Sequence, residues 1–344
     1  MRTSALIISL LLLVPTAACV SAQDDPTTVH DLRVLGIGFE PPEVLLTRCN
    51  ALTLRGLLAS QADGGSLANV DSALLIELLS VGARPLGFKA LIADPKGAGR
   101  ALDYQLSVCT DIADRTCSNP DKRSLLSEGQ YSGESGELSM QVSPVVATND
   151  AGVISVRAIT NGTPVLLDVV QNDTYRGLGG IRIPVVLELT APDTGERIFA
   201  QKLMPYVCRF LPQMEQNVLP VLPGMTARSE PWGPDQVIEF GGRTAIDMEP
   251  LDFSALEETY VLPSLQLQPV TLTESWKIAH YTSSGTMSPY ETGGTNIGGE
   301  ESRANFKWTP DATNNQPVDI HFYFVVRDGR GGESWITRRG RWTP

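Results

Sequence analysis

The residues that most often perform chemistry are sparse in this chain, and they form no catalytic or metal-binding pattern. The three histidines, His30, His280 and His321, share no spacing that would place two of them around a zinc ion from one helix or turn. The polar stretch SGESGELS, residues 132–139, lacks the second glycine at the offset that a serine nucleophile elbow requires. We therefore predict no catalytic residue, no metal ligand and no cofactor.

Glycine-rich and acidic segments are equally weak signs of a reactive site. RGLGGI, residues 176–181, lacks the Lys-Ser or Lys-Thr pair of a phosphate-binding loop and precedes a strand pattern instead of opening a helix. The carboxylate pairs Glu134 with Glu137 and Glu257 with Glu258 lie in polar surroundings. Solvated surface is the usual position of such acidic residues, so we predict no chemistry for them.

A long polar segment is the candidate for recognition. Residues 281–302, YTSSGTMSPYETGGTNIGGEES, are predicted to form a flexible connection between strands. Tyr281 and Tyr290 lie there among small polar residues, a composition that serves recognition in the loops of β-sandwiches. These tyrosines could stack on a sugar or contact a protein; the alternative is a mobile loop with no ligand.

The N-terminus predicts export. Residues 1–18 have the basic start, apolar run and small-residue end of a secretory signal. Two cleavage sites compete: TAAC, residues 16–19, resembles a bacterial lipobox that would leave diacylglycerol on Cys19, whereas Val20-Ser21-Ala22 fits ordinary cleavage that discards this cysteine. We favour lipidation of Cys19, with residues 19–30 as a polar tether. Val20 follows this cysteine at the position where an aspartate marks retention in the inner membrane. The absence of that aspartate indicates the outer membrane of a Gram-negative bacterium, on a side that the sequence does not reveal.

The charge of the chain excludes some partners. The formal net charge of −12 becomes −13 when Arg2 is removed with the leader, and the acidic residues are scattered. Nucleic acid and anionic lipid are poor partners for such a surface. Apart from the membrane that holds the lipid anchor, the expected partner is an envelope protein or a glycan.

The remaining cysteines form an even set, which suits an oxidising compartment. Cys109 and Cys117 enclose a short polar stretch, and Cys109 lies opposite the apolar face of residues 101–109. This favours a surface loop closed by a Cys109–Cys117 disulfide, which leaves Cys49–Cys208 as a long-range bond. Buried free thiols are the alternative.

The chain after residue 31 has the pattern of a β protein, with short apolar runs separated by Gly, Pro, Asn and Asp. The clearest strand and turn is the predicted hairpin over residues 183–204. Two short helices are possible, over residues 72–82 after Asp71, where a buried strand is the alternative, and over residues 163–177. The other strands expected in this first domain, residues 31–210, cover residues 32–39, 88–95, 101–109 and 152–159.

Residues 211–235 are rich in proline and glycine and are predicted to be an interdomain linker. Beyond this linker, strand patterns recur often enough to suit a β-sandwich over residues 236–344. These strands are expected at residues 237–240, 244–248, 260–270, 274–281, 305–310, 319–328 and 334–342.

The C-terminal domain resembles an immunoglobulin-like or PKD-like bacterial surface module. The resemblance is carried by Trp276, by Trp308-Thr309-Pro310, by a strand of alternating apolar residues from Ile320 to Val326, and by the turn Asp328-Gly329-Arg330-Gly331-Gly332. The whole chain is also similar in layout to uncharacterised lipoproteins of myxobacteria and related envelopes. These resemblances imply a location and a fold, with Trp276 and Trp308 in an inter-sheet core, but they imply no activity.

The sequence as a whole favours a mainly β protein of two sandwich-like domains, the second immunoglobulin-like, with one or two short helices in the first. The predicted function is that of a non-enzymatic envelope lipoprotein that binds a protein or a glycan. One alternative is an enzyme or enzyme-accessory protein with its site in the first domain. The other is a purely structural stalk.

Overall fold

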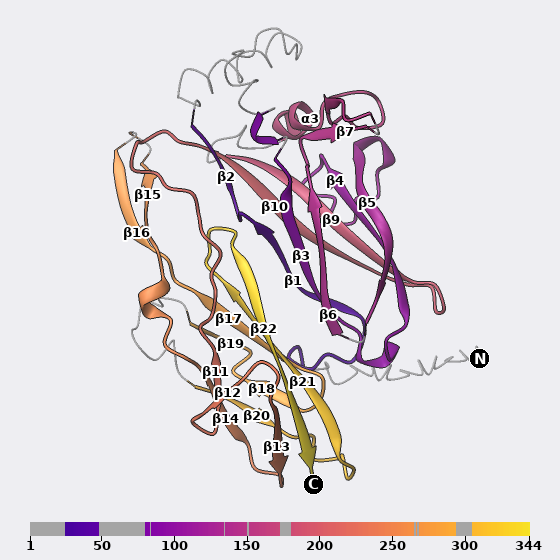
Figure 1. Cartoon of the computed structure of the whole chain (residues 1–344), viewed down its shortest axis with the longest axis vertical. Coiled ribbons are helices and arrows are strands. Elements are labelled where there is room, and N and C mark those ends of the chain that lie inside the picture. Colours follow the sequence, from indigo (N-terminus) through magenta and orange to yellow (C-terminus); the bar gives the residue numbers. More distant parts are fainter. Residues whose placement is uncertain are drawn as a thin grey trace, which may run out of the picture.

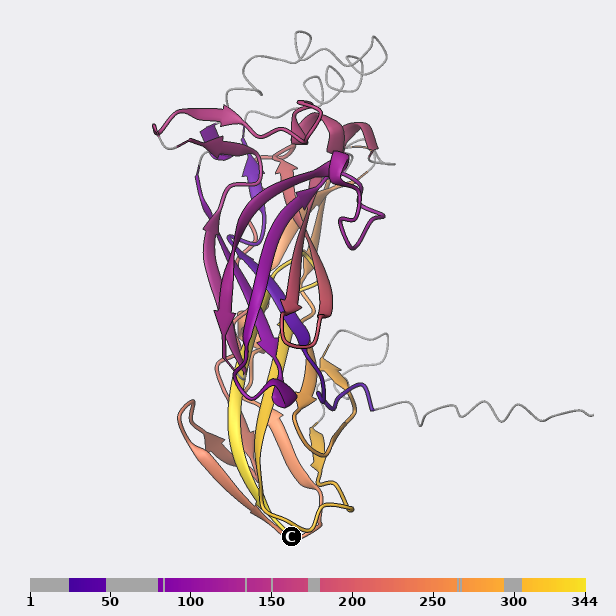
Figure 2. The same ribbon diagram turned by 90° about the vertical axis from the view of Figure 1, so that its right-hand side faces the viewer.

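The computed structural model describes residues 25–47, 80–82, 84–133, 135–149, 151–172, 180–264, 266, 268–293 and 305–344. Within these ranges the chain is mainly β, and it forms two lobes that lie one beyond the other along the long axis (Figure 1 and Figure 2). The first lobe, residues 31–210, and the second lobe, residues 225–344, each contain two larger sheets that pack together and one two-stranded sheet. The predicted fold class, mainly β with two sandwich-like domains, is therefore confirmed.

The first lobe packs a sheet of order β1-β3-β6 against a sheet of order β2-β10-β9-β4-β5. The predicted hairpin is present as β9 and β10, in which one face of β9 is buried in the core, as its alternating pattern indicated. The strands of these two sheets are β1 (Arg33–Glu40), β2 (Val44–Leu46), β3 (Leu86–Ala93), β4 (Ala101–Cys109), β5 (Arg123–Ser132), β6 (Ser135–Val142), β9 (Ile181–Ala191) and β10 (Glu196–Cys208).

Short elements cover one end of the first lobe. The helix predicted over residues 163–177 is present as α3 (Val165–Asn172), and a small hairpin, β7 (Val146–Thr148) with β8 (Ile154–Val156), lies near it (Figure 1). The 3-10 turns η2 (Pro95–Gly97) and η3 (Pro120–Lys122) connect strands. The other predicted helix lies outside the described residues except for 80–82, which are helical.

The Cys109–Cys117 disulfide is present and closes an exposed polar loop, so this prediction is confirmed. Cys109 lies against Val186 and Phe199, on the face of the sheet opposite the main core of the lobe. Cys208 is also disulfide-bonded, and Cys49, its predicted partner, lies outside the described residues.

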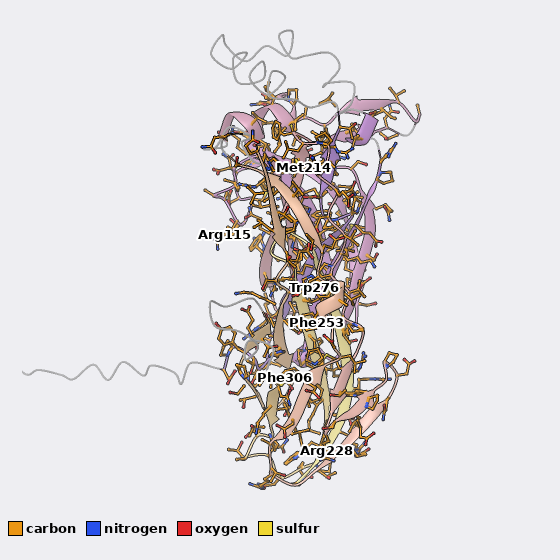
Figure 3. All side chains as sticks on the ribbon, turned by 90° about the vertical axis from the view of Figure 1, so that its left-hand side faces the viewer. Arg115, Met214, Arg228, Phe253, Trp276 and Phe306 are labelled. Atoms are coloured by element: carbon orange, nitrogen blue, oxygen red, sulfur yellow. A yellow bond between two sulfur atoms is a disulfide. The ribbon has the colours of Figure 1, made fainter. Side chains whose placement is uncertain are left out.

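The second lobe packs a sheet of order β12-β11-β14-β20-β18 against a sheet of order β13-β22-β21-β17-β19. Trp276 and Trp308 are buried in its core, as predicted, and Figure 3 shows Trp276 beside Phe253, on which its ring stacks. The strands are β11 (Met225–Ala227), β12 (Glu230–Trp232), β13 (Val237–Gly241), β14 (Ile246–Pro250), β17 (Lys277–Thr282), β18 (Thr286–Ser288), β19 (Glu291–Gly293), β20 (Phe306–Thr309), β21 (Val318–Arg327) and β22 (Glu333–Thr343).

Two predicted boundaries are wrong in part. The linker is shorter than residues 211–235, because β11 and β12 already belong to the second lobe. Residues 260–270 do not form one strand. They belong to a hairpin, β15 (Thr259–Pro263) with β16 (Pro269–Thr273), which follows the 3-10 turn η4 (Ser254–Leu256) and extends from the second lobe beside the first (Figure 1).

The predicted polar tether is also wrong at its end, because residues 27–29 are buried. The backbone N–H of Val29 donates to the carbonyl of Thr282, and the Thr28 hydroxyl donates to the carbonyl of Gly285. Thr27 accepts a hydrogen bond from the N–H of Met287. Small polar side chains that satisfy buried backbone groups allow this uncharged stretch to dock on the second lobe.

Candidate functional site

The two lobes are joined through strands that are buried on both faces. On β21, Phe322 and Phe324 point into the core of the second lobe, whereas Tyr323 and Val325 point the other way. There they meet Leu91 and other apolar residues on the outer face of the β1-β3-β6 sheet. A strand buried on both faces needs a continuous apolar run, which explains the HFYFVV sequence that departs from simple alternation.

Glycines let β1 approach β22 closely at this junction. A Cβ atom on Gly36 would lie 3.0 Å from the Trp335 ring, and one on Gly38 would lie 2.5 Å from the carbonyl oxygen of Glu333. Side chains at these two positions would therefore push the lobes apart.

The junction opens into a cavity of about 600 Å³ beyond this close contact. We call this cavity the interlobe groove. Its walls come from the end of β1 and the Pro41-Pro42 turn, from β3 and β6, from the start of β22 and from the linker. The lining residues are Gly38, Phe39, Glu40, Pro41, Pro42, Lys89, Glu137, Gln216, Asn217, Val218, Leu219, Val221, Glu333, Ser334 and Trp335.

The linker wall is extended and apolar on its exposed side. Figure 3 places Met214, near the start of the linker, toward the far end of the first lobe, so the segment runs along this lobe before it enters the second. Val218 and Val221 are 59% and 60% exposed. Large apolar side chains left uncovered beside a hollow are typical of a surface that binds a partner.

The opposite wall carries charge. The amine of Lys89 lies between the carboxylates of Glu40, at 3.9 Å, and Glu137, at 3.8 Å. Glu333, deeper in the groove, is paired with Lys202 at 2.8 Å and with Arg327 at 2.9 Å. The mouth of the groove therefore has more negative than positive charge.

A buried ionic cluster around Arg330 fixes the geometry behind the groove. Its guanidinium pairs with Glu43 of the first lobe at 3.1 Å, with Glu274 at 3.3 Å and with Glu258 at 3.4 Å. The same guanidinium lies over the Tyr260 ring, 4.3 Å from its centroid. One residue in the β21–β22 turn thus connects the first lobe to the base of the β15–β16 hairpin.

The turn that carries Arg330 forms as the sequence predicts. The Asp328 carboxylate accepts hydrogen bonds from the N–H of Arg330 and of Gly332, and Gly329 and Gly331 have positive φ. Asn217 of the linker donates from its amide to Asp328 and from its backbone N–H to Glu43, so the linker is bound into the cluster.

The cluster holds more carboxylates than cations, and this affects their titration. Burial raises the pKa of Glu43, and burial likewise raises the pKa of Glu274, although Arg330 and Trp276 stabilise the charged forms. Both carboxyl groups therefore resist ionisation more than exposed glutamates do.

Two of the three histidines, His280 and His321, lie within strands, as the sequence predicts. His280 in β17 is fully buried and stacks on Phe306, with its ring nitrogens 3.0 Å from the Pro289 carbonyl and the Thr292 hydroxyl. Burial lowers the pKa of His280 to about 4. His321 lies in β21, whereas exposed His30 follows the docked residues 27–29.

The predicted binding loop is mostly regular structure at its start. Tyr281 belongs to β17 and packs against the apolar contact between the lobes. Tyr290 is 66% exposed between β18 and β19, and residues 294–302 lie outside the described ranges. The structure does not bring Tyr281 and Tyr290 into the interlobe groove.

Other predicted positions bear on location or chemistry. Cys19, with the signal and the start of the tether, lies outside the described residues, as does Glu134. Glu137 lines the groove, while Glu257 accepts a hydrogen bond from the N–H of Trp276 and Glu258 joins the Arg330 cluster. In the part of the chain that the structure describes, no group of His, Cys, Asp or Glu could hold a metal ion, and no helix is long and apolar enough to cross a membrane.

Sequence reasoning missed the groove because its walls come from segments far apart in the chain. Two signals were available: the alternating glycines of LGIGF, residues 35–39, and the arginine inside DGRGG, residues 328–332. Alternating glycines in a strand indicate close approach by another backbone, and a cation in a tight turn can reach across a domain boundary.

Comparisons with known proteins add little to this geometry. No protein-family model and no curated protein matches the chain. Among solved structures, the fibronectin(III)-like modules of Clostridium thermocellum CbhA match with a TM-score of 0.18 and 8% identity, over 76% of this chain and 85% of that chain. Dimeric latent PorU from Porphyromonas gingivalis matches with a TM-score of 0.20 and 10% identity, over 92% of this chain and 24% of that chain. Both TM-scores are too low to indicate a shared function.

Proposed function

We propose that this protein is a non-enzymatic lipoprotein of the outer membrane, held by lipid on Cys19, and that it binds an envelope partner in the interlobe groove. The observation that carries the binding half of the proposal is the groove itself. It is a hollow of about 600 Å³ that combines uncovered valines, an aromatic ring and a few charged groups, the usual composition of a binding site.

The fixed arrangement of the lobes supports a binding role. The apolar contact around Tyr323 and the Arg330 cluster hold the walls of the groove from both sides. A preformed site loses less conformational freedom when a partner binds, so its contacts contribute more of their free energy to affinity.

The location half of the proposal is tested by the mass of the mature N-terminal peptide in the native chain and in Cys19→Ala. We expect a cysteine with a diacylglycerol-sized addition in the native chain only. A native peptide that begins at Gln23 would contradict the lipid anchor.

The binding half is tested by chemical crosslinking of intact membranes, followed by recovery of the tagged full chain. We expect a discrete complex that disappears when Val218 and Val221 are both changed to Asp. The matched control changes Val153 and Ile154 to Asp; these residues are 58% and 56% exposed in the β7–β8 hairpin. A complex that survives the groove substitutions, or the absence of any complex, would refute binding at the groove.

A further inference from the structure

We propose that the interlobe groove accepts an extended polypeptide strand in which an apolar side chain is followed by a lysine or arginine. This inference rests on the proposed function, because it names the occupant of the same groove.

Unpaired backbone on both walls favours a strand as the occupant. In the linker wall, the N–H groups of Asn217 and Val218 donate to the carboxylates of Glu43 and Glu258, and the Pro220 carbonyl accepts from Ser334. The backbone groups of Leu219 and Val221, which also line the groove, make no hydrogen bond within the described residues. On the opposite side, β1 is an edge strand of the β1-β3-β6 sheet, and its residues 38–40 line the groove. Edge strands and extended segments with free N–H and C=O groups are the usual acceptors of an added strand.

The apolar side chains provide a place for an anchor. Val218 and Val221 project from the linker with more than half of their surface exposed, and Trp335 lines the facing wall. Successive side chains of a strand point to opposite sides, so an added strand can direct every second side chain at these residues. An aliphatic side chain of moderate size fits this lining.

The charge at the mouth selects a basic neighbour for the anchor. Lys89 is the cation between Glu40 and Glu137, and both carboxylates are partly exposed, at 63% and 39%. An incoming lysine or arginine would balance the second carboxylate, and the formal net charge of −12 on the whole chain acts in the same direction.

The polar groups of the groove fit a glycan less well. Glu333 is paired with Lys202 and Arg327, the Ser334 hydroxyl donates to the Pro220 carbonyl, and the Asn217 amide donates to Asp328. A sugar needs side-chain donors and acceptors that are free to bind its hydroxyls. Apart from the charged mouth and Gln216, what this groove offers is backbone groups and apolar surface.

The test measures fluorescence anisotropy of three labelled peptides with the purified full chain. The first peptide alternates valine with lysine, the second alternates valine with glutamate, and the third is the lysine peptide with N-methyl groups on alternate backbone nitrogens. We expect the lysine peptide to bind, and each of the others to bind about tenfold more weakly, through charge repulsion or lost backbone hydrogen bonds. A soluble N-acetylglucosamine oligomer serves as the glycan probe and should not compete.

Variants then locate the binding. Changing Val218 and Val221 together to Ser should weaken the lysine peptide roughly fivefold through lost apolar contact, whereas Val153→Ser with Ile154→Ser should leave its affinity unchanged. Serine adds no charge, so the effect reports contact alone.

Three results would overturn the inference: no binding of the lysine peptide at about 1 mM, equal affinity for all three peptides, or an affinity that the groove variant does not alter. If the envelope complex requires Val218 and Val221 while the peptides fail, only the strand inference is wrong. If the complex still forms when Val218 and Val221 are changed, the proposed function is wrong as well.

Discussion

Replacing Arg330 by methionine should destabilise the protein strongly at neutral pH. The substitution keeps an apolar side chain over Tyr260 but leaves Glu43 and Glu274 without their guanidinium. Removing one partner of a buried ion pair costs about 3 to 5 kcal/mol. Glu258 is about one-third exposed, so solvent weakens its ion pair with Arg330. We therefore expect a loss of unfolding free energy at the lower end of this range, about 3 kcal/mol.

The cost should shrink as the pH falls. Burial raises the pKa of Glu43 and of Glu274, and without Arg330 both pKa values rise further. The folded variant then binds protons that the unfolded chain does not bind, so acid stabilises its folded state relative to the unfolded state. The difference in unfolding free energy between the native chain and the variant should therefore be smaller at about pH 5 than at about pH 7.5.

Urea unfolding followed by tryptophan fluorescence measures this cost. All five tryptophans lie in the second lobe, and the Trp276 indole N–H donates to Glu274, so the signal reports the disturbed region. The matched control is Arg341→Met, which removes an exposed pair with Asp319 and should cost below about 1 kcal/mol. Equal costs for the two variants, or an Arg330 cost that grows toward acid, would refute the role given to the cluster.

Three further substitutions test the packing. His280→Gln removes a ring whose pKa is lowered by burial to about 4, whereas the unfolded histidine binds its proton near pH 6.5. The unfolding free energy of the native chain should therefore fall by roughly 3 kcal/mol relative to that of the variant between about pH 6.5 and pH 4. Parallel pH profiles of the two proteins would contradict this. Tyr323→Ala should cost about 3 kcal/mol in urea unfolding, against less than about 0.5 kcal/mol for the exposed Tyr290→Ala, and similar costs would show that the lobe contact contributes little. Gly38→Ala should cost more than about 1 kcal/mol in the same assay, because the added Cβ meets a carbonyl of the facing strand. Gly87→Ala should cost less, since its added Cβ would lie 3.4 Å from the nearest atom, the Cβ of Glu40. The reverse order of costs would contradict the close approach.

Local patterns predicted much of the fold. The β9–β10 hairpin follows from the alternating apolar residues around a Gly-containing turn, and the Asp328 turn follows from its glycines and carboxylate. The Cys109–Cys117 loop follows from short spacing and strand polarity. In each case the determining contacts join segments that are adjacent in the chain.

Long-range contacts explain the errors. The segment 27–29 has the sequence of a polar tether, and the residues of the second lobe that it contacts lie more than two hundred positions away in the chain. Met225 sits in a proline-rich segment whose strand partner, Pro250, cannot be identified from alternation. The groove depends on the same kind of contact, since its lining residues 38–40, 216–219 and 333–335 come from distant parts of the chain.

The central claim, that the interlobe groove is where this protein meets its partner, is tested most directly by a photo-crosslinking amino acid placed at Val218 and, separately, at Val153. The two positions are almost equally exposed, at 59% and 58%, and only Val218 lines the groove. After irradiation of intact cells, we predict a discrete crosslinked product from position 218 and none from position 153. Equal products from both positions, or a product from position 153 alone, would contradict the claim.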